Sequence, residues 1–144
     1  MTPTSLENNI IYLAGELTHV LHRALTSSFK KNKIHVTVEQ FSILALLFYK
    51  NGINQQEISV ALNRDKTTIA RVISNMERNK LVARVMDKSD SRGKLIHLTT
   101  KGKNLQQRAI RHSGELYFRA IKGVSKGALH DTNRTLSAIL KNLK

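Results

Sequence analysis

The chain has 144 residues with a hydrophobic fraction of 40%, which suffices for one domain with a single core and excludes a disordered chain. It carries 24 lysines and arginines against 10 acidic residues, so its formal charge of +14 predicts a polyanionic partner, with nucleic acid ahead of an anionic membrane surface. It has no cysteine, which excludes disulfides, thiolate metal sites and cysteine-based oxidation sensing and fits a reducing cytoplasm.

The first third of the chain predicts two helices. Apolar residues recur at three- and four-residue steps over roughly residues 6–31, which is typical of a long amphipathic helix. A second helix is expected to run through Lys50, because Thr37 and Gln40 have the spacing of a capping box and Asn51-Gly52 can end it. Its apolar residues lie on nearly every side, so we expect it to be central and buried.

A helix-turn-helix is predicted next. Asn54 and Glu57 form another capping box, with Ile53 placed as a staple residue. Asn63-Arg64 makes the turn, and Asp65 caps the following helix. Within that helix an apolar stripe faces inward, formed by Ile69, Val72, Ile73 and Met76.

Residues 81–85 and 95–99 alternate apolar with polar side chains and predict two strands. The turn formers at 87–93 join them into one β-hairpin. Thr99 or Thr100 is expected to cap a helix to about Lys122, and Ser125 a last helix. The fold class is therefore mainly α with a small β-hairpin wing, in a single domain of residues 1–144. We expect a winged helix-turn-helix core over 35–100, with a helical dimerisation region at 1–34 and 101–144.

With the apolar stripe inward, the outward face of the 65–79 helix is polar and basic. It comprises Lys66, Thr67, Thr68, Arg71, Ser74, Asn75 and Arg78. Such side chains read base edges, since arginine pairs with guanine, asparagine with adenine and threonine with thymine. The first turns, 66–71, should enter a major groove deepest. A solvated helix face would be polar too, and the capped helix before it and the hairpin after it favour DNA.

Local charge supports the same interpretation. Residues 64–103 hold eleven lysines and arginines against four acids, and phosphate neutralisation of this kind drives duplex binding. In the hairpin tip, Arg92 is the candidate for a minor groove, and Asp90 is placed to orient the tip or to pair with a neighbouring arginine. Both could also belong to a plain surface turn. Further candidate DNA contacts in the hairpin are Arg84, Lys88 and Ser91.

From about Thr37 to Gly102 the chain resembles the multiple antibiotic resistance regulator (MarR) family of bacterial winged-helix transcription factors. The resemblance rests on the helix-turn-helix, Leu-Val-x-Arg at 81–84, Asp-x-Arg at 90–92 and Leu-Thr-x-x-Gly at 98–102. The flanking helices match in placement. The resemblance implies a homodimer joined through the N- and C-terminal helices that binds a pseudo-palindromic operator. Many such proteins release DNA when a small ligand binds or a cysteine oxidises.

One residue departs from the family pattern. Where such proteins usually have glycine before the Leu-Val strand, this chain has Lys80. A lysine held at positive φ costs on the order of 1 kcal/mol. Alternatively, Asn79 could take the left-handed position.

The effector is hardly visible in the sequence. A small aromatic or other small molecule would be expected where the first, second and fifth helices meet the predicted helix-turn-helix. The candidate contacts are Leu17, Leu21, Phe41, Leu44 and Tyr117. Apolar residues at helical spacing also fit an ordinary core. His19 and His22 share a helix face, but one pair is a poor metal site. The sequence therefore predicts no metal and no cofactor.

No enzyme motif is found: the sequence has no glycine-rich phosphate loop, no HExxH and no GxSxG. The longest apolar run, residues 43–49, is too short to span a bilayer, and residues 1–9 do not read as a secretory signal. The sequence thus predicts a homodimeric, cytoplasmic regulator of transcription, with repression as its expected sign. The alternative is a basic winged-helix module for protein assembly or RNA binding without operator specificity.

Overall fold

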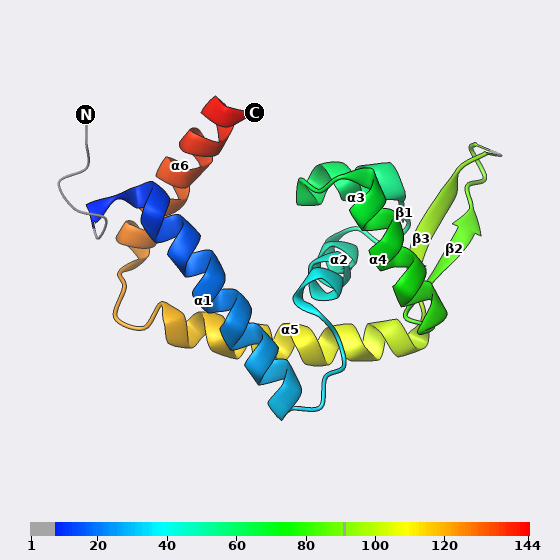
Figure 1. The fold of residues 1–144 in the computed structure, drawn as a ribbon, viewed down its shortest axis with the longest axis horizontal. Helices are drawn as coiled ribbons and strands as arrows, with labels where there is room; N and C mark the ends of the chain where they lie inside the picture. Colours follow the sequence, from blue (N-terminus) through cyan, green and yellow to red (C-terminus); the bar gives the residue numbers. More distant parts are fainter. Residues whose placement is uncertain (1–7, 91) are drawn as a thin grey trace. The chain divides into compact units, whose positions relative to one another are not determined.

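The computed structural model describes residues 8–90 and 92–144. The chain divides after Ser113 into two compact units, which are described separately. The elements are, in chain order, α1 (Ile10–Lys31), α2 (Val38–Tyr49), β1 (Ile53–Asn54), α3 (Gln55–Leu62), α4 (Lys66–Arg78), β2 (Val82–Met86), β3 (Lys94–Leu98), α5 (Thr100–Ala120) and α6 (Lys126–Leu143) (Figure 1).

The predicted capping boxes are confirmed. The Thr37 hydroxyl accepts from the Gln40 backbone N–H at 3.1 Å, and the Gln40 side chain accepts from the Thr37 N–H at 3.0 Å. Asn54 and Glu57 exchange the same two bonds at 2.8 and 2.9 Å. The pKa of Glu57 is lowered, first by its bond to the Asn54 N–H and then by Lys50.

Helix α1 begins at Ile10, where the Asn9 side chain accepts from the Ile11 N–H at 2.9 Å. The expected start near residue 6 lies outside the described residues. At the other end, Asn32 forms the C-cap after two lysines, Lys30 and Lys31, whose charge suits a helix C-terminus.

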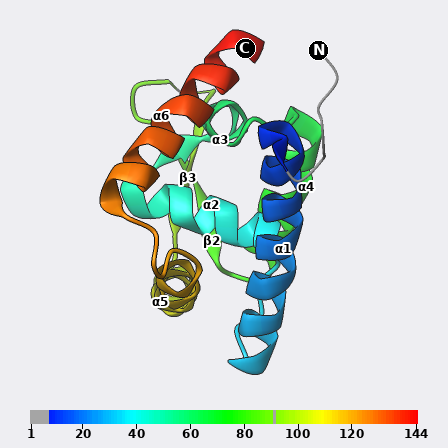
Figure 2. The same ribbon diagram turned by 90° about the vertical axis from the view of Figure 1, so that its left-hand side faces the viewer.

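The helix-turn-helix has the expected geometry. Asn63 closes α3 in the left-handed conformation at φ +50°, and α4 starts one residue after Asp65. All four residues of the α4 stripe are buried, and they pack with Ile43, Leu44 and Leu47 of α2 in one core cluster. Figure 2 shows α2 below α3 with the strands behind it, so α2 is central as expected. Its burial is only partial: Gln40, Ile43, Leu44 and Leu47 are buried, whereas Phe48 and Tyr49 at its end are 56% and 85% exposed.

The sheet has three strands rather than the two that the sequence predicted. β2 and β3 form the expected hairpin, with Val82 opposite Leu98 and Met86 opposite Lys94. β1 adds to the other edge of β3, pairing Ile53 with Ile96. Gly52, at φ +75°, donates its N–H to the Ile96 carbonyl at 3.0 Å and lets the chain turn into this strand. A strand of two residues is too short to show an alternating apolar and polar pattern, so the sequence did not predict β1.

The start of α5 is joined tightly to the end of α4. Thr99, one of the two predicted caps, accepts from the Gly102 N–H at 2.9 Å and donates its hydroxyl to the Lys80 carbonyl at 2.6 Å. A Cβ on Gly102 would lie 1.9 Å from the Leu81 carbonyl oxygen. The Leu-Thr-x-x-Gly motif therefore holds the start of α5 against the backbone that leads into β2. Only glycine at position 102 allows the two segments to approach this closely.

The second unit contains the end of α5 and all of α6. Helix α5 ends at Ala120, two residues before the predicted end, and Ser125 caps α6 by accepting from the Ala128 N–H at 3.1 Å. No residue of α6 is buried. Within the described part of the chain, every helix is too short or too polar to cross a lipid bilayer.

The left-handed position before β2 is taken by Lys80 at φ +59°, while Asn79 has φ −81°. Of the two alternatives, Lys80 is therefore the strained residue. We expect Lys80→Gly to raise the free energy of unfolding by about 0.5–1 kcal/mol, because relief of strain exceeds the freedom that glycine adds to the unfolded chain. Urea denaturation followed by circular dichroism measures this.

Lys80→Ala is the matched control, since it removes the amino group and keeps the strain. An equal gain from alanine would show that lysine charge, not φ, is responsible. Gly102→Ala should act in the opposite direction and destabilise by about 2–3 kcal/mol, because the Cβ meets backbone that cannot move aside.

Candidate nucleic-acid interface

Helix α4 presents a polar, cationic face. Lys66, Thr67, Arg71, Ser74 and Arg78 are exposed, whereas the predicted partners Thr68 and Asn75 are half-buried. The exposed set begins in the first turn, where the free N–H groups and the positive end of the helix dipole also lie. This face can approach an anionic surface without any rearrangement of the core.

Asp65 fixes the first turn of α4. Its carboxylate accepts from the Thr68 N–H at 2.8 Å and from the Thr68 hydroxyl at 2.6 Å. The two bonds, the hydroxyl bond first, lower the pKa of Asp65. Because the Thr68 hydroxyl is used here, Thr68 stabilises the helix start and leaves mainly Lys66, Thr67 and Arg71 to face outward.

Arg71 has an acidic neighbour that sequence spacing does not reveal. Its guanidinium lies 3.7 Å from the carboxylate of Glu39 on α2, and the two side chains are 69% and 56% exposed. An ion pair this exposed contributes at most about 1 kcal/mol. Arg71 can therefore leave Glu39 for a stronger partner at small cost.

Asn75 is held from two sides. Its side-chain oxygen accepts from the Gln40 amide at 2.8 Å and from the Asn79 amide at 3.1 Å. Gln40 is itself buried. Sequence reasoning identified Gln40 only as a capping residue, because its contact with a helix 35 positions away has no local signal.

Arg84, a predicted DNA contact, is engaged with α4. It pairs with Glu77 and donates to the Ser74 hydroxyl at 3.3 Å, and its side chain is only 22% exposed. The pair joins β2 to α4 and so sets the hairpin against the helix. Figure 1 shows the hairpin running beside α4. Glu77 was not among the predicted site residues.

The hairpin tip is organised by acidic side chains. Asp90 accepts from the Arg92 N–H at 3.0 Å, and its own carbonyl accepts from the Gly93 N–H at 3.0 Å. Asp87 binds the hydroxyl and N–H of Ser89, and these bonds, the hydroxyl first, lower its pKa. The side chains of Arg92 and Lys88 are exposed. The predicted contact Ser91 lies outside the described residues.

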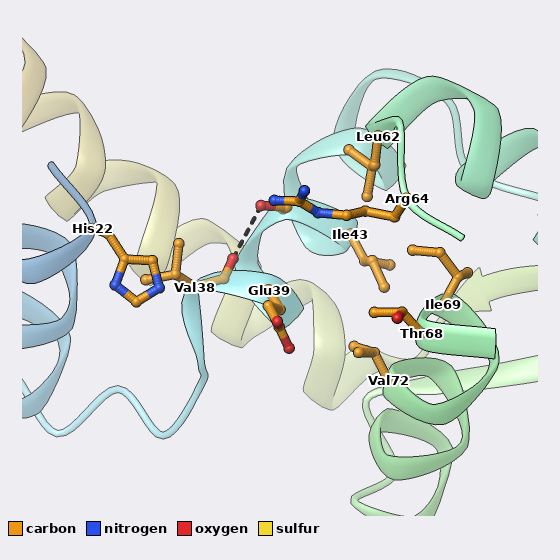
Figure 3. A pocket seen from close by; sticks show the side chains of 10 residues that line it. His22, Val38, Glu39, Ile43, Leu62, Arg64, Thr68, Ile69 and Val72 are labelled. Carbon is orange, nitrogen blue, oxygen red and sulfur yellow. Dashed lines mark hydrogen bonds between the residues drawn. The ribbon is translucent and has the colours of Figure 1, made fainter. Parts of the chain in front are cut away.

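A cavity of about 170 Å³ lies beneath the start of α4 (Figure 3). His22 of α1 lines one side, Val38, Glu39, Ser42 and Ile43 come from α2, and Leu62, Arg64, Thr68, Ile69 and Val72 complete it. A volume near 150 Å³ holds a benzene-sized molecule. An occupant would touch both Thr68 and the acid that pairs with Arg71.

None of the residues predicted to line an effector pocket lines this cavity. Leu44 is fully buried in the core, and Phe41 packs edge-on against Phe29 with ring centroids 5.2 Å apart. Leu17 is 54% exposed, Leu21 is half-buried, and Tyr117 is exposed in the second unit. Their role as effector contacts stays a prediction. Among the described residues, no three histidines, aspartates or glutamates gather into a possible metal set.

A tri-helical unit with a capped helix-turn-helix, an antiparallel wing and a cationic face on its second helix defines a winged-helix DNA-binding protein. Comparison with known proteins agrees. The model of the MarR family matches residues 36–94. The organic hydroperoxide resistance transcriptional regulator of Bacillus subtilis is 27% identical over 136 residues, which cover 93% of this chain and 86% of that protein.

Two solved structures of protein–DNA complexes are also similar. The S. aureus MepR–DNA complex has a TM-score of 0.86 at 26% identity, covering 97% of this chain and 100% of that chain. A MarR family regulator from Listeria monocytogenes complexed with a 26mer DNA has a TM-score of 0.84 at 26% identity, covering 94% and 89%. The winged-helix core of this chain therefore matches the MarR family, and the chain is similar over most of its length to DNA-binding transcriptional regulators.

The Asp65 cap makes the start of α4 pH-sensitive. Because its pKa is lower in the folded state, its stabilisation is complete above the unfolded pKa and is lost as the pH falls through the folded pKa. We expect the Thr68 amide resonance to titrate below the ordinary pKa of aspartate in an NMR titration. Asp65→Asn still caps the helix and should abolish that titration. A midpoint at or above the ordinary aspartate value would contradict the assignment.

Proposed function

We propose that this protein is a homodimeric repressor that binds a pseudo-palindromic operator and releases it when a small molecule binds. The observation that carries the proposal is the exposed cationic face of α4 beside a wing whose tip presents Arg92. In this arrangement Lys66, Thr67 and Arg71 enter a major groove, and Arg92 enters the adjacent minor groove. Arg78 and Lys88 contact phosphates. Arg84 acts indirectly, because its ion pair with Glu77 positions β2 against α4.

Dimerisation is supported by apolar side chains that are exposed in the described part of a single chain. On α1, Ile10, Leu13, Leu17 and Val20 are 40–54% exposed. On α6, Leu140 and Leu143 are 55% and 78% exposed. A second copy would bury both faces and place two α4 helices at half-sites about 10 bp apart. Sedimentation equilibrium at micromolar concentration should give twice the chain mass.

Release by a ligand is supported by the cavity beneath α4. It suits a molecule of about one aromatic ring, since five aliphatic side chains line it beside the polar groups of His22, Glu39 and Arg64. A ligand that binds the DNA-free state more tightly shifts the protein off its operator by that difference in affinity. Screening small aromatic compounds for operator release tests this part.

The decisive experiment is selection of binding sites from random DNA, followed by salt-titrated binding. The selected palindrome, a random duplex and a structured RNA should be compared at the same salt concentration. Preference for the palindrome by roughly 10³-fold or more supports operator binding. Equal binding to all three would support the alternative of a basic module for assembly or RNA.

Arg71 is the residue expected to read a base. Arg71→Ala should cost about 1–3 kcal/mol of binding free energy on the selected operator and relax its specificity at one base pair. Binding to the operator and its single-base-pair variants measures both effects. Glu39→Gln, which removes the competing partner, should not weaken binding. If Arg71→Ala weakens binding to all sequences equally, Arg71 contacts phosphate instead.

Arg92 is expected to contribute to DNA binding and not to the stability of the fold. Its side chain is exposed and its backbone N–H is the group that Asp90 binds, so Arg92→Ala should weaken operator binding and leave the melting temperature almost unchanged. Fluorescence anisotropy and differential scanning calorimetry measure the two quantities. Asp90→Ala is the comparison, because it removes the bond that shapes the tip. A large fall in the melting temperature of Arg92→Ala would reject a purely DNA-facing role.

A further inference from the structure

The contacts of Asn75 determine what this residue can recognise. A bidentate pair with adenine needs the amide oxygen of asparagine as an acceptor and its nitrogen as a donor. An amide oxygen has two lone pairs. In this protein both are taken, one by the Gln40 amide at 2.8 Å and one by the Asn79 amide at 3.1 Å.

The orientation of both amides follows from a backbone group. The Thr37 N–H can only donate, so the group of Gln40 that faces it at 3.0 Å must be the oxygen. The Gln40 nitrogen then faces Asn75, and since that nitrogen can only donate, Asn75 must present its oxygen inward. The Thr37 N–H thus sets the orientation of both amides in the hydrogen-bond chain from Thr37 through Gln40 to Asn75, which we call the relay.

We propose that Gln40 is a positioning residue that holds Asn75 with only its N–H donors available to DNA, so that Asn75 contacts phosphate and adds affinity without reading adenine. This inference rests on the proposed operator binding. Asn75 lies in the third turn of α4, beyond the first two turns that enter the groove, and exposed Arg78 follows it on the same face. Burial of Gln40, at 8% exposure, shields its bond to the Asn75 oxygen from water, while the bond from Asn79 to the same oxygen is exposed.

The test is a double-mutant cycle of Asn75→Ala and Gln40→Glu on the selected palindromic duplex and its single-base-pair variants. Asn75→Ala should lower affinity about fivefold, the value of one hydrogen bond, on every variant alike. Gln40→Glu keeps the acceptor for Thr37 but cannot donate, so the Asn75 amide turns around. It should therefore weaken binding in the wild-type background by more than it does in the Asn75→Ala background, where any remaining loss measures its added charge.

Three results would overturn the inference. Loss of tenfold or more in discrimination at any single base pair with Asn75→Ala would show that Asn75 reads a base there. An unchanged affinity would show that Asn75 does not contact DNA. Equal effects of Gln40→Glu with and without Asn75 would show that Gln40 does not act through it.

A measurement on the DNA-free protein separates this inference from the proposed function. In ¹⁵N NMR, the side-chain amide protons of Gln40 should exchange slowly with solvent and those of Asn75 rapidly, and Gln40→Glu should slow the exchange of the Asn75 protons. If Asn75 is the protected amide in the wild type, the relay is wrong. If the relay holds but no duplex is bound selectively, the proposed function fails and the contact assigned to Asn75 fails with it.

Discussion

The burial of one apolar stripe on α4 determines which side of the helix stays exposed, and this is the side that we propose contacts DNA. Ile69, Val72, Ile73 and Met76 are between 0% and 4% exposed, and each contributes about 1.5–3 kcal/mol when buried. Rotation of α4 about its axis would expose this stripe. The outward position of Lys66, Thr67 and Arg71 is therefore a consequence of core packing. These side chains need no bond to another residue to face outward.

The wing is joined to the rest of its unit by contacts at its base and along β2. At its base, the Thr99 hydroxyl and the close approach of Gly102 to Leu81 join α5 to the chain between α4 and β2. Along β2, Arg84 pairs with Glu77 of α4. These contacts link the wing to α4, and the two surfaces proposed to enter neighbouring grooves lie in the same unit, which ends at Ser113.

Much of this arrangement could be predicted from sequence, because its signals are local. Both capping boxes, the Asp65 cap, the buried stripe and the hairpin each depend on residues within a few positions of one another. The pairs Arg71–Glu39 and Gln40–Asn75 join residues more than 30 positions apart, and no spacing rule reveals them. Strand β1 was missed because two residues carry no period. The cavity was not located because its lining comes from α1, α2, the end of α3, the α3–α4 turn and α4, which are brought together only by folding.

The relay from Thr37 through Gln40 to Asn75 has a consequence for protein engineering. Replacing one residue of a recognition helix is the usual first step in retargeting a regulator to a new operator. Here position 75 has a partner on another helix, so a new side chain there would face the amide nitrogen of buried Gln40, a donor that needs an acceptor. Libraries that vary positions 40 and 75 together would explore binding preferences that single-site libraries cannot reach.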